Sequence, residues 1–570
     1  MPPNDSAGHP SPREPDPRYS ALISNAAAIR AVASAVESTL GPKGLNCMLV
    51  DRGGDVTVTN DGSTILSRID ASHPAARILV RAARSQDEEV GDGTTTTAVL
   101  AAALISEGQS HVLRGVPVSM LIEGLRRGIA AAVEFVESRA IRCESMEDAA
   151  LESAVRVAAR GEEQIARAVL KAAAVLGVER LIEPGFDLRQ SLVLAPGGRT
   201  ESFAGIVLAR DRLNRQMPEA LSNVTCLVIS DALEPEAVEA EALTTERGFS
   251  AYVQNLERFK ASVAALAATG VGLVAVQKGV HDLAEQALTE AGSIVLRRVG
   301  ASDIARLAGH TGARVLKRQA LLDGPVPVDA FGRAVSVETD SRRGHVLIKG
   351  GAGEPAATVL VGAGTREVAE ETRRMAEDAC GALQSALRTG LAPGGGSVEL
   401  AAARSLDAIR AQVSGMAAYG LDCVREALRK PIAQIAANAG YNPLEKVEQA
   451  SAAQERAHSC SIGIDCDSGE AADMLALGVL DPVGVRTRAL ATAMMTEGQC
   501  VAEALGVRFS IALEQRLAGA EAVGHARGDG DHVLERPRHL AAHHVGIDVH
   551  AEELLVEDPL EVLGHHRVGG

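Results

Sequence analysis

The sequence predicts a multidomain protein that combines α-helical and α/β parts. Its 570 residues are about three to four times the usual size of one domain, and 46% of them are apolar, which is enough for more than one core. Apolar residues recur with a helical period near both ends, whereas β-like runs alternate with helical stretches between about 204 and 362. A helical module is therefore predicted to be split in sequence and closed around an inserted α/β module.

The composition narrows the class of protein further. Aromatic residues make up 2% of the chain, with no Trp, and Gly numbers 56, so the cores must use small aliphatic side chains. The net charge of -17 argues against a nucleic-acid partner. There is no apolar signal core, no membrane-length apolar run and no CxxC pair among eight cysteines. We expect a soluble, cytoplasmic protein with reduced thiols and no membrane partner.

The first elements follow in order from the N-terminus. Residues 1–17 hold six prolines and no apolar period, so they are expected to form a flexible arm. Ile29, Val32, Val36 and Leu40 have the spacing of one buried helical face, which Gly41-Pro42 would end. Two short β-like runs, 47–50 and 56–59, flank a glycine turn and predict a hairpin.

The later elements repeat this alternation. Helices are predicted from about 64 to 140, with a break at Gly91-Asp92-Gly93. Runs at 224–230, 271–277 and 293–299 predict strands of the inserted module. Long Ala-rich helices return at 366–390 and 395–506, broken by Pro393-Gly394-Gly395-Gly396. The segment 507–570 holds eight of the fifteen histidines and no convincing period.

The segment from Gly91 to Thr97 has the composition of a phosphate-binding loop. It precedes an apolar helix, so it would offer a phosphate the free amide groups and positive end of that helix, together with hydroxyls and close backbone approach. Asp92 would supply a carboxylate for Mg²⁺. The alternative is a turn with a Thr N-cap.

Four other segments are individually weak signals. The Leu40–Gly44 turn could be a plain C-cap, Asn60-Asp61-Gly62 a hairpin turn, Asp378 part of a solvated helix face, and the Pro393–Gly396 segment a linker. What is specific is their order and spacing along one chain.

Those motifs together resemble the group II chaperonins, the archaeal thermosome and eukaryotic cytosolic type. The matching series is LGPKG (40–44), TNDGSTIL (59–66), HPAA (73–76), SQDEEVGDGTTT (85–96), PGGG (393–396) and DMLALGVLDPVGVR (473–486). HPAA and QDEEVGDGTTT favour group II over group I, and the Arg-heavy, Ala-rich composition also fits the group II-like chaperonins of some bacteria. The resemblance covers residues 18–506.

The resemblance implies a chaperonin fold of three domains. They would be a mostly helical equatorial ATPase domain (18–145 and 396–506), a small intermediate domain (146–203 and 363–395), and an inserted α/β apical substrate-binding domain (204–362). A helical protrusion at about 240–262 would form a built-in lid, so no separate lid co-chaperonin is expected. The arm 1–17 and the atypical His-rich tail 507–570 lie outside this plan, and no function is assigned to the tail.

The resemblance also implies the site residues. ATP and Mg²⁺ would be held by nucleotide contacts at Leu40, Gly41, Pro42, Gly93 and Gly395, phosphate contacts at Thr94, Thr95 and Thr96, a ribose contact at Asp481 and a metal ligand at Asp92. Asp61 and Asp378 match the two carboxylates that orient the attacking water, in keeping with the need of phosphoanhydride hydrolysis for a placed water.

One residue departs from the family pattern. Where group II members commonly have a Lys that senses the γ-phosphate, this chain has Arg160. Arginine keeps the charge but changes the geometry. Arg160 either contacts a phosphate or is a solvated helix charge.

The predicted protrusion contains an aromatic face. Phe249, Tyr252, Leu256 and Phe259 fall at spacings of 3, 4 and 3, which places them on one side of a helix. This face would either contact other lids and client proteins or pack inside the apical domain.

The function implied is that of an ATP-dependent molecular chaperone, an ATP hydrolase coupled to protein folding. It would self-associate into stacked rings that enclose non-native client proteins. The alternative is a chaperonin-derived ring scaffold or adaptor without productive ATP turnover.

Overall fold

The computed structural model describes residues 19–50, 53–54, 56–195, 197–236 and 244–504. The predicted arm and tail, and residues 240–243 of the predicted protrusion, lie outside the described residues. No helix in the described ranges is long and apolar enough to cross a membrane.

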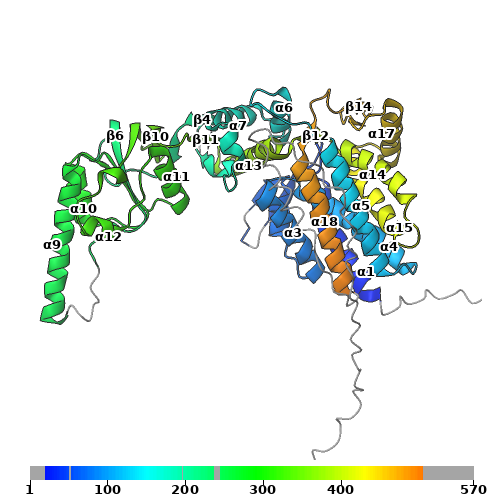
Figure 1. Cartoon of the computed structure of the whole chain (residues 1–570), viewed down its shortest axis with the longest axis horizontal. Helices are drawn as coiled ribbons and strands as arrows, with labels where there is room; N and C mark the ends of the chain where they lie inside the picture. Colours follow the sequence, from blue (N-terminus) through cyan, green and yellow to red (C-terminus); the bar gives the residue numbers. More distant parts are fainter. Residues whose placement is uncertain (1–18, 51–52, 55, 196, 237–243, 505–570) are drawn as a thin grey trace, which may run out of the picture. The chain divides into compact units, whose positions relative to one another are not determined.

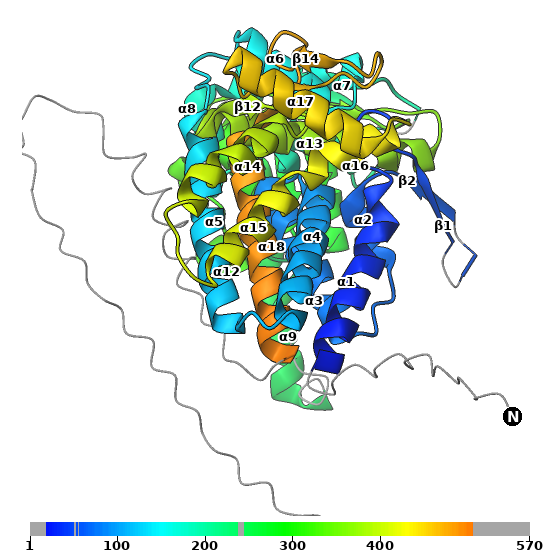
Figure 2. The ribbon, with the colours of Figure 1, turned by 90° about the vertical axis from the view of Figure 1, so that its right-hand side faces the viewer.

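Helices from both ends of the chain form one bundle (Figures 1 and 2). Its helices are α1 (Ser20–Glu37), α2 (Gly62–Arg68), α3 (Pro74–Val90), α4 (Thr94–Leu113), α5 (Val118–Ser138), α14 (Ser397–Arg410), α15 (Ala418–Leu428), α16 (Lys430–Asn438), α17 (Pro443–Ala457) and α18 (Val483–Ala504). The helix α18 packs against α1, α3, α4 and α5, which confirms the predicted split of the helical module.

Small residues let these helices pack closely. A Cβ atom at Gly124 of α5 would lie 1.9 Å from the carbonyl oxygen of Ala417, and one at Gly420 of α15 would lie 2.3 Å from that of Leu121. The two backbones therefore meet where only glycine fits, which explains how a chain poor in aromatics fills its core.

The predicted hairpin is confirmed, and the first helix is shorter than expected. Strands β1 (Cys47–Val50) and β2 (Val56–Thr59) pair antiparallel. The helix α1 buries Ile29, Val32 and Val36 but ends at Glu37, so Leu40 lies beyond it. The hydroxyl of Thr39 donates to the carbonyl oxygen of Val36 at 2.8 Å, which satisfies a terminal carbonyl and closes the helix before Gly41.

A second core joins residues on either side of the inserted module. It contains α6 (Ala149–Ala158), α7 (Glu163–Leu176), α8 (Val178–Ile182), the 3₁₀ turn Leu188–Ser191, α13 (Arg366–Thr389) and a sheet in the order β3-β11-β4 (Leu192–Leu194, Ala357–Val361, Glu201–Ala204). The long helix α13 packs on α6 and α7 and carries Asp378.

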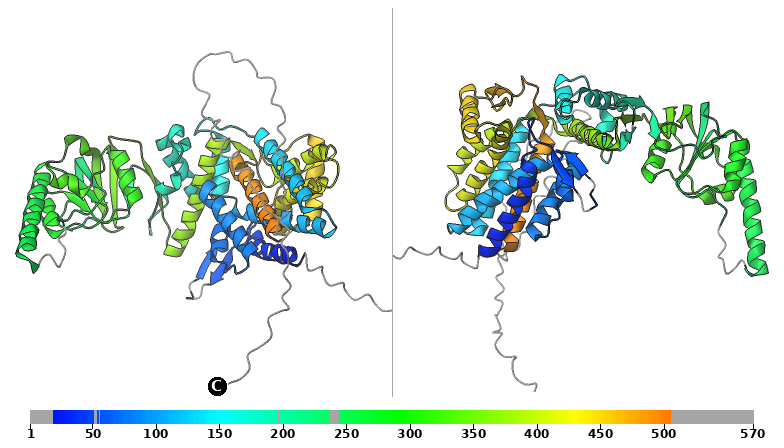
Figure 3. Two further views of the ribbon diagram at one scale, coloured as in Figure 1. Left: turned by 60° about the horizontal axis from the view of Figure 1, so that its bottom comes forward. Right: turned by 180° about the vertical axis from the view of Figure 1, so that it is seen from behind.

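The inserted α/β module is a six-stranded sheet with helices on both faces. The strand order is β5 (Ile206–Leu208), β10 (His345–Gly351), β9 (Gly332–Asp340), β6 (Ala220–Ile229), β7 (Leu273–Val276) and β8 (Ile294–Leu296). The last three are parallel and match the strands predicted from sequence. The helix α11 (Ala301–Thr311) covers one face of the sheet. The other face is covered by α9 (Glu246–Ala268), α10 (Asp282–Glu290) and α12 (Arg318–Leu322). Figure 3 shows this module in green.

The predicted aromatic face of α9 is divided in two. Phe259 is 1% exposed and packs edge-on against His281, with ring centroids 5.7 Å apart. Phe249 is 58% exposed and Tyr252 is 37% exposed, whereas Leu256 is half-buried. Of the two alternatives for this face, packing inside the module is therefore what Phe259 does, because the C-terminal half of α9 lies on the sheet, whereas Phe249 and Tyr252 are exposed.

Four short strands complete the described structure. The strand β12 (Leu391–Pro393) pairs with β15 (Leu480–Pro482), and β13 (Ile462–Ile464) pairs with β14 (Ala471–Asp473). The first pair sets Ala392 opposite Asp481, so it brings the Gly394–Gly396 turn next to that carboxylate.

Candidate functional site

The loop Gly91–Gly93 leaves the N-terminus of α4 open. Gly91 and Gly93 have φ of 73° and 84°, conformations that favour glycine, and they reverse the chain between α3 and α4. The N-cap of α4 is Gly93, and no side chain of the described residues caps the helix. The alternative of a Thr N-cap was therefore wrong. The uncapped amides and the positive helix end form a place suited to an anion.

The threonines after this loop lie at the start of a buried helix. Thr94 and Thr96 are 6% and 4% exposed. A Cβ atom at Gly62 would lie 2.3 Å from Oγ1 of Thr95, so the chain after Asp61 runs directly against these hydroxyls. The turn Asn60-Asp61-Gly62 and the threonine run therefore meet in space, although 30 residues of sequence separate their aspartates Asp61 and Asp92.

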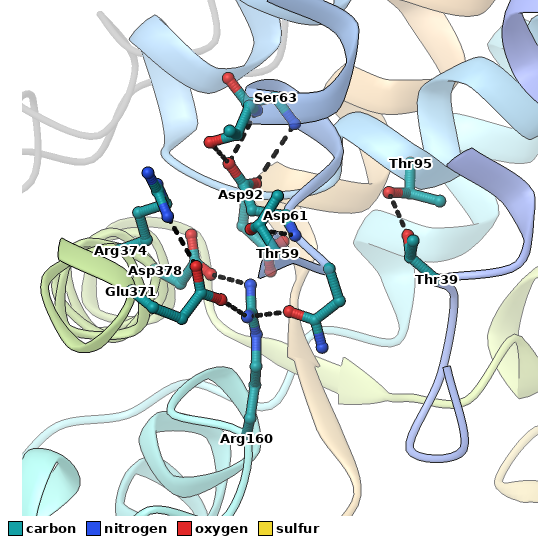
Figure 4. Close-up of polar contacts among 12 residues, drawn as sticks. Thr39, Thr59, Asp61, Ser63, Asp92, Thr95, Arg160, Glu371, Arg374 and Asp378 are labelled. Carbon is teal, nitrogen blue, oxygen red and sulfur yellow. Dashed lines mark hydrogen bonds and ion pairs between the residues drawn. The ribbon is translucent and has the colours of Figure 1, made fainter. Parts of the chain in front are cut away.

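Asp61 is the N-cap of α2 rather than part of a hairpin turn. Its carboxylate accepts from the amides of Ser63 at 3.2 Å and Thr64 at 2.8 Å, and from the hydroxyl of Thr64 at 2.6 Å. These bonds fix the side chain beside the start of α4. Ser63 in turn donates its hydroxyl to Asp87 of α3 at 2.9 Å (Figure 4).

Arg160 reaches this cluster from the end of α6. Its guanidinium donates to Glu371 at 2.8 Å and to Asp378 at 3.2 Å, both on α13, and also to the side-chain oxygen of Asn60 (Figure 4). The Arg160 side chain is 27% exposed. The alternative of a solvated helix charge is thus excluded, since Arg160 links the second core to the bundle.

Burial, together with neighbouring carboxylates, raises the pKa values of three carboxyl groups at the site. Burial, and then the charge of Asp92, raise the pKa of Asp378 well above its usual range, against the opposing effect of Arg160. Burial also raises the pKa of Asp92, although the Gly93 amide and Arg486 oppose the shift. Burial raises the pKa of Asp87 too, and the charge of Asp61 raises it further. Burial and nearby like charges therefore disfavour the ionised carboxylates here unless a cation lies beside them.

These residues fit a divalent cation that is shared with phosphates. In the described ranges no group of three or more His, Cys, Asp or Glu could hold a metal ion. A Mg²⁺ ion beside Asp92 would take most of its oxygen ligands from phosphate and water, as this cation usually does. The cation is favoured by the placement of the donors, since Asp92 lies in the loop directly before the uncapped amides of α4, and Asp61 and Asp378 line the cleft beside it.

A cleft of about 360 Å³ opens beside the carboxylates. It is within the usual size range of small-molecule sites. The residues that line it are Asp61, Asp87, Gly91, Arg189, Gln190, Arg373, Arg374, Glu377 and Asp378.

The predicted nucleoside contacts adjoin this cluster from two sides. Gly41 has a φ of 86°, and Asn438 donates its amide to the carbonyl oxygens of Glu37 and Leu40, which holds the turn that contains Pro42. Thr39 lies next to this turn, and its hydroxyl is 3.5 Å from that of Thr95.

On the other side, Asp481 lies against the glycine turn. A Cβ atom at Gly394 would lie 2.6 Å from Oδ2 of Asp481, so only glycine leaves that approach open. Gly395 follows with a φ of 64° and faces the sulfur of Met474. Arg486 of α18 pairs with Asp481 and donates to Oγ1 of Thr96 at 3.3 Å, which connects this side with the threonine run.

Sequence reasoning missed several residues of the cluster. Asn60 and Glu371 both contact Arg160, and Arg486 joins Thr96 to Asp481. Asp87 accepts from Ser63, next to the predicted turn, and lines the cleft beside Asp61 and Asp378. Asn60, Asp87 and Arg486 lie within the motifs quoted above, so adjacency was an available signal. Glu371 lies on α13, seven residues before Asp378. This spacing is about two helical turns, so both side chains lie on the same face of the helix.

Comparisons with known proteins agree with this architecture. The model of the TCP-1/cpn60 chaperonin family matches residues 32–500. A thermosome subunit of Pyrococcus horikoshii is 32% identical over 486 residues, and one of Methanopyrus kandleri is 33% identical over 486 residues. Each alignment covers 82% of this chain and 88% of the relative.

A solved structure is similar over most of the chain. The crystal structure of a group III chaperonin in the open state has a TM-score of 0.78 and 40% sequence identity, and the match covers 87% of this chain and 99% of that one. The thermosome relatives confirm the predicted resemblance, and this structure confirms the predicted fold. The chain is therefore a member of the TCP-1/cpn60 chaperonin family and has the chaperonin fold.

Proposed function

We propose that this chaperonin is an ATP-dependent molecular chaperone that encloses non-native proteins in a double-ring chamber and assists their folding. The observation that carries the proposal is the uncapped N-terminus of α4 with Asp61, Asp92 and Asp378 around it. A scaffold without ATP turnover has no physical need for all three carboxylates.

The proposed domains are those expected from the resemblance. The equatorial domain is 18–145 and 396–506, the intermediate domain 146–203 and 363–395, and the apical domain 204–362. The strand β11 of the last range hydrogen-bonds to β3 and β4, so it continues the sheet of the intermediate segment.

In the proposed mechanism the α4 amides and the hydroxyls of Thr94, Thr95 and Thr96 hold the phosphates. Asp92 holds Mg²⁺, which when bound neutralises the charge of the phosphate oxygens. Asp61 stays fixed by its capping bonds, so it accepts a hydrogen bond from the attacking water in one defined position.

Asp378 reaches the site from the second core, whereas Asp61 belongs to the bundle. It lies on α13, and Arg160 donates to its Oδ2 at 3.2 Å, so its other oxygen can accept from a water while the pair is closed, and both oxygens can when it opens. Since Arg160 and Asp378 come from the proposed intermediate domain, movement of that domain controls hydrolysis. We infer that Arg160 contacts the terminal phosphate when it leaves Asp378.

Self-association into rings is supported by the exposed face of the β1–β2 hairpin. Met48 and Val50 are 68% and 61% exposed, and Val56 and Val58 are each 52% exposed. These residues alternate along both strands, so they form one apolar face. A two-stranded sheet with such a face is marginal alone and suits a contact with another subunit.

Changing the cross-strand pair Met48 and Val58 to Glu is expected to break the rings. Two charges on the apolar face would be buried without partners at a subunit contact. Gel filtration and negative-stain images of the parent protein should show double rings, and the double variant should elute as a monomer. Thr57→Ser, on the other face, should leave the rings intact. Parent protein that is monomeric under all conditions would contradict the ring proposal.

The N-terminal half of α9 is expected to act as the built-in lid. Phe249 and Val253 are 58% and 43% exposed, and Arg247 and Arg258 are exposed protease sites. Trypsin should cut at these arginines without nucleotide, and ATP with a phosphate transition-state mimic should protect them, because closed lids pack against one another. Phe249→Ser should weaken this protection. An unchanged cleavage pattern with nucleotide would contradict the lid.

A further inference from the structure

Arg486 lies between the two ends of the proposed nucleotide site. It belongs to the first turn of α18 and is 13% exposed. Its Nη2 pairs with Oδ2 of Asp481, at the ribose end. Its Nη1 donates to Oγ1 of Thr96 at 3.3 Å, at the phosphate end. One guanidinium therefore contacts both ends.

The third neighbour of Arg486 is an almost unsatisfied carboxylate. Glu399, in the first turn of α14, is 1% exposed. Its Oε1 lies 3.4 Å from Nε of Arg486, but among the described residues neither its oxygens nor that Nε has a hydrogen-bond partner. Burial raises the pKa of Glu399, and Arg486 opposes the shift. A buried carboxylate that has no hydrogen bond to its neighbouring cation costs free energy, so we expect another interaction of the site to offset that cost.

Asp481 cannot accept hydrogen bonds from Arg486 and from a ribose equally well. Its Oδ2 is the oxygen that Arg486 holds and also the one that faces Gly394, where the missing Cβ leaves the approach open. Burial alone would lower the pKa of Arg486, but Asp481 and Glu399 raise it above its usual value, so the guanidinium stays charged and needs a carboxylate. Glu399 is the acceptor available if Asp481 turns to a ribose.

We propose that Arg486 is a positioning residue that transfers its hydrogen bonds from Asp481 to Glu399 when ribose hydroxyls bind Asp481. Its Nε and one Nη then form the two parallel bonds that suit a carboxylate. The guanidinium stays beside Thr96. Ribose binding at Asp481 therefore changes the hydrogen bonds of the group that contacts the phosphate end. This inference rests on the proposed nucleotide function.

The test is the preference of the full chain for ADP over 2′,3′-dideoxy-ADP, measured by calorimetry. In the parent protein ADP should bind about tenfold more tightly, as expected when charged hydrogen bonds to the ribose are gained. Glu399→Gln removes the charge that draws Arg486 away, so Asp481 stays occupied. This variant should lose most of the preference, while its affinity for dideoxy-ADP stays within about twofold of the parent value.

Two further variants separate positioning from general stability. Arg486→Lys keeps the positive charge but lacks the two parallel N–H donors of a guanidinium. It should therefore lose the preference for ADP over dideoxy-ADP, as Glu399→Gln does. Glu455→Gln, an exposed glutamate of α17, should change nothing. If Glu399→Gln lowers the unfolding temperature but keeps the parental preference for ADP, Glu399 is merely structural and the transfer is disproved. A parent protein that binds neither nucleotide overturns the proposed function itself, and this inference with it.

Discussion

Asp378→Ala is expected to bind ATP with nearly parental affinity and to hydrolyse it at least about 10²-fold more slowly. The reason is geometric, because Asp378 lies on α13, outside the α4 loop that would hold the phosphates. Its loss removes the group that positions the water, while Arg160 keeps Glu371 as a partner at 2.8 Å. Binding by calorimetry and turnover by phosphate release, measured on the same preparation, check this result.

Glu163 of α7, which does not line the cleft, provides the control. It pairs with Arg167 one turn away on the same helix, at 2.8 Å, and exposed pairs of this kind contribute little. Glu163→Ala should therefore turn over ATP at close to the parental rate. If Asp378→Ala lost binding and turnover to the same degree, its role would be structural rather than catalytic.

Glu497→Gln is expected to stabilise the protein at neutral and alkaline pH. Glu497 lies on α18 and is 0% exposed, and neither of its oxygens has a hydrogen-bond partner among the described residues. A Cβ atom at Gly108 of α4 would lie 2.8 Å from its Oε1, so the carboxyl fits tightly between the two helices. Burial raises the pKa of Glu497 to about 8 from an ordinary 4.5.

The sign of the pH effect follows from this shift. Because the folded state holds the proton more tightly, stability is lost as the pH rises from about 4.5 to about 8 and is constant above that. At pH 7 the loss is about 3 kcal/mol, from roughly 1.4 kcal/mol per pH unit. The Gln variant lacks this titration, so its advantage should grow with pH across that window.

Urea unfolding at pH 5, 7 and 8.5 checks this prediction. The midpoint of Glu497→Gln should be close to that of the parent at pH 5 and clearly higher at pH 7 and 8.5. Glu107→Gln, at a half-buried position of α4, is the control and should follow the parent. Parallel pH profiles for Glu497→Gln and the parent would show that this carboxyl does not titrate with folding.

Much of the fold could be predicted from local sequence. The period of Ile29, Val32 and Val36 identified a buried helix face, and the β-branched run 224–230 identified a central strand. What local pattern could not predict was where each element packs. Phe259 belongs to the same helical face as Phe249, but it is buried because the sheet lies under only one half of α9.

In the candidate site, too, some residues could be predicted from local sequence and others could not. The glycines and threonines around Asp92 were predicted because loop geometry and chemistry leave a local signature. The partners of Arg160 and Arg486 were not predicted, since their contacts span 218 and 390 residues of sequence. Such pairs depend on how the split modules close on each other, which no window of sequence contains.

ATP hydrolysis by the purified full chain, measured with and without Mg²⁺ and compared with that of Asp92→Ala, tests the proposed nucleotide site most directly. We expect steady turnover by the parent protein that EDTA abolishes, and turnover below about 1% of the parental rate in the variant, because the metal loses its protein ligand. Hydrolysis by Asp92→Ala at the parental rate, or a parent protein that gains nothing from Mg²⁺, would contradict the proposed site.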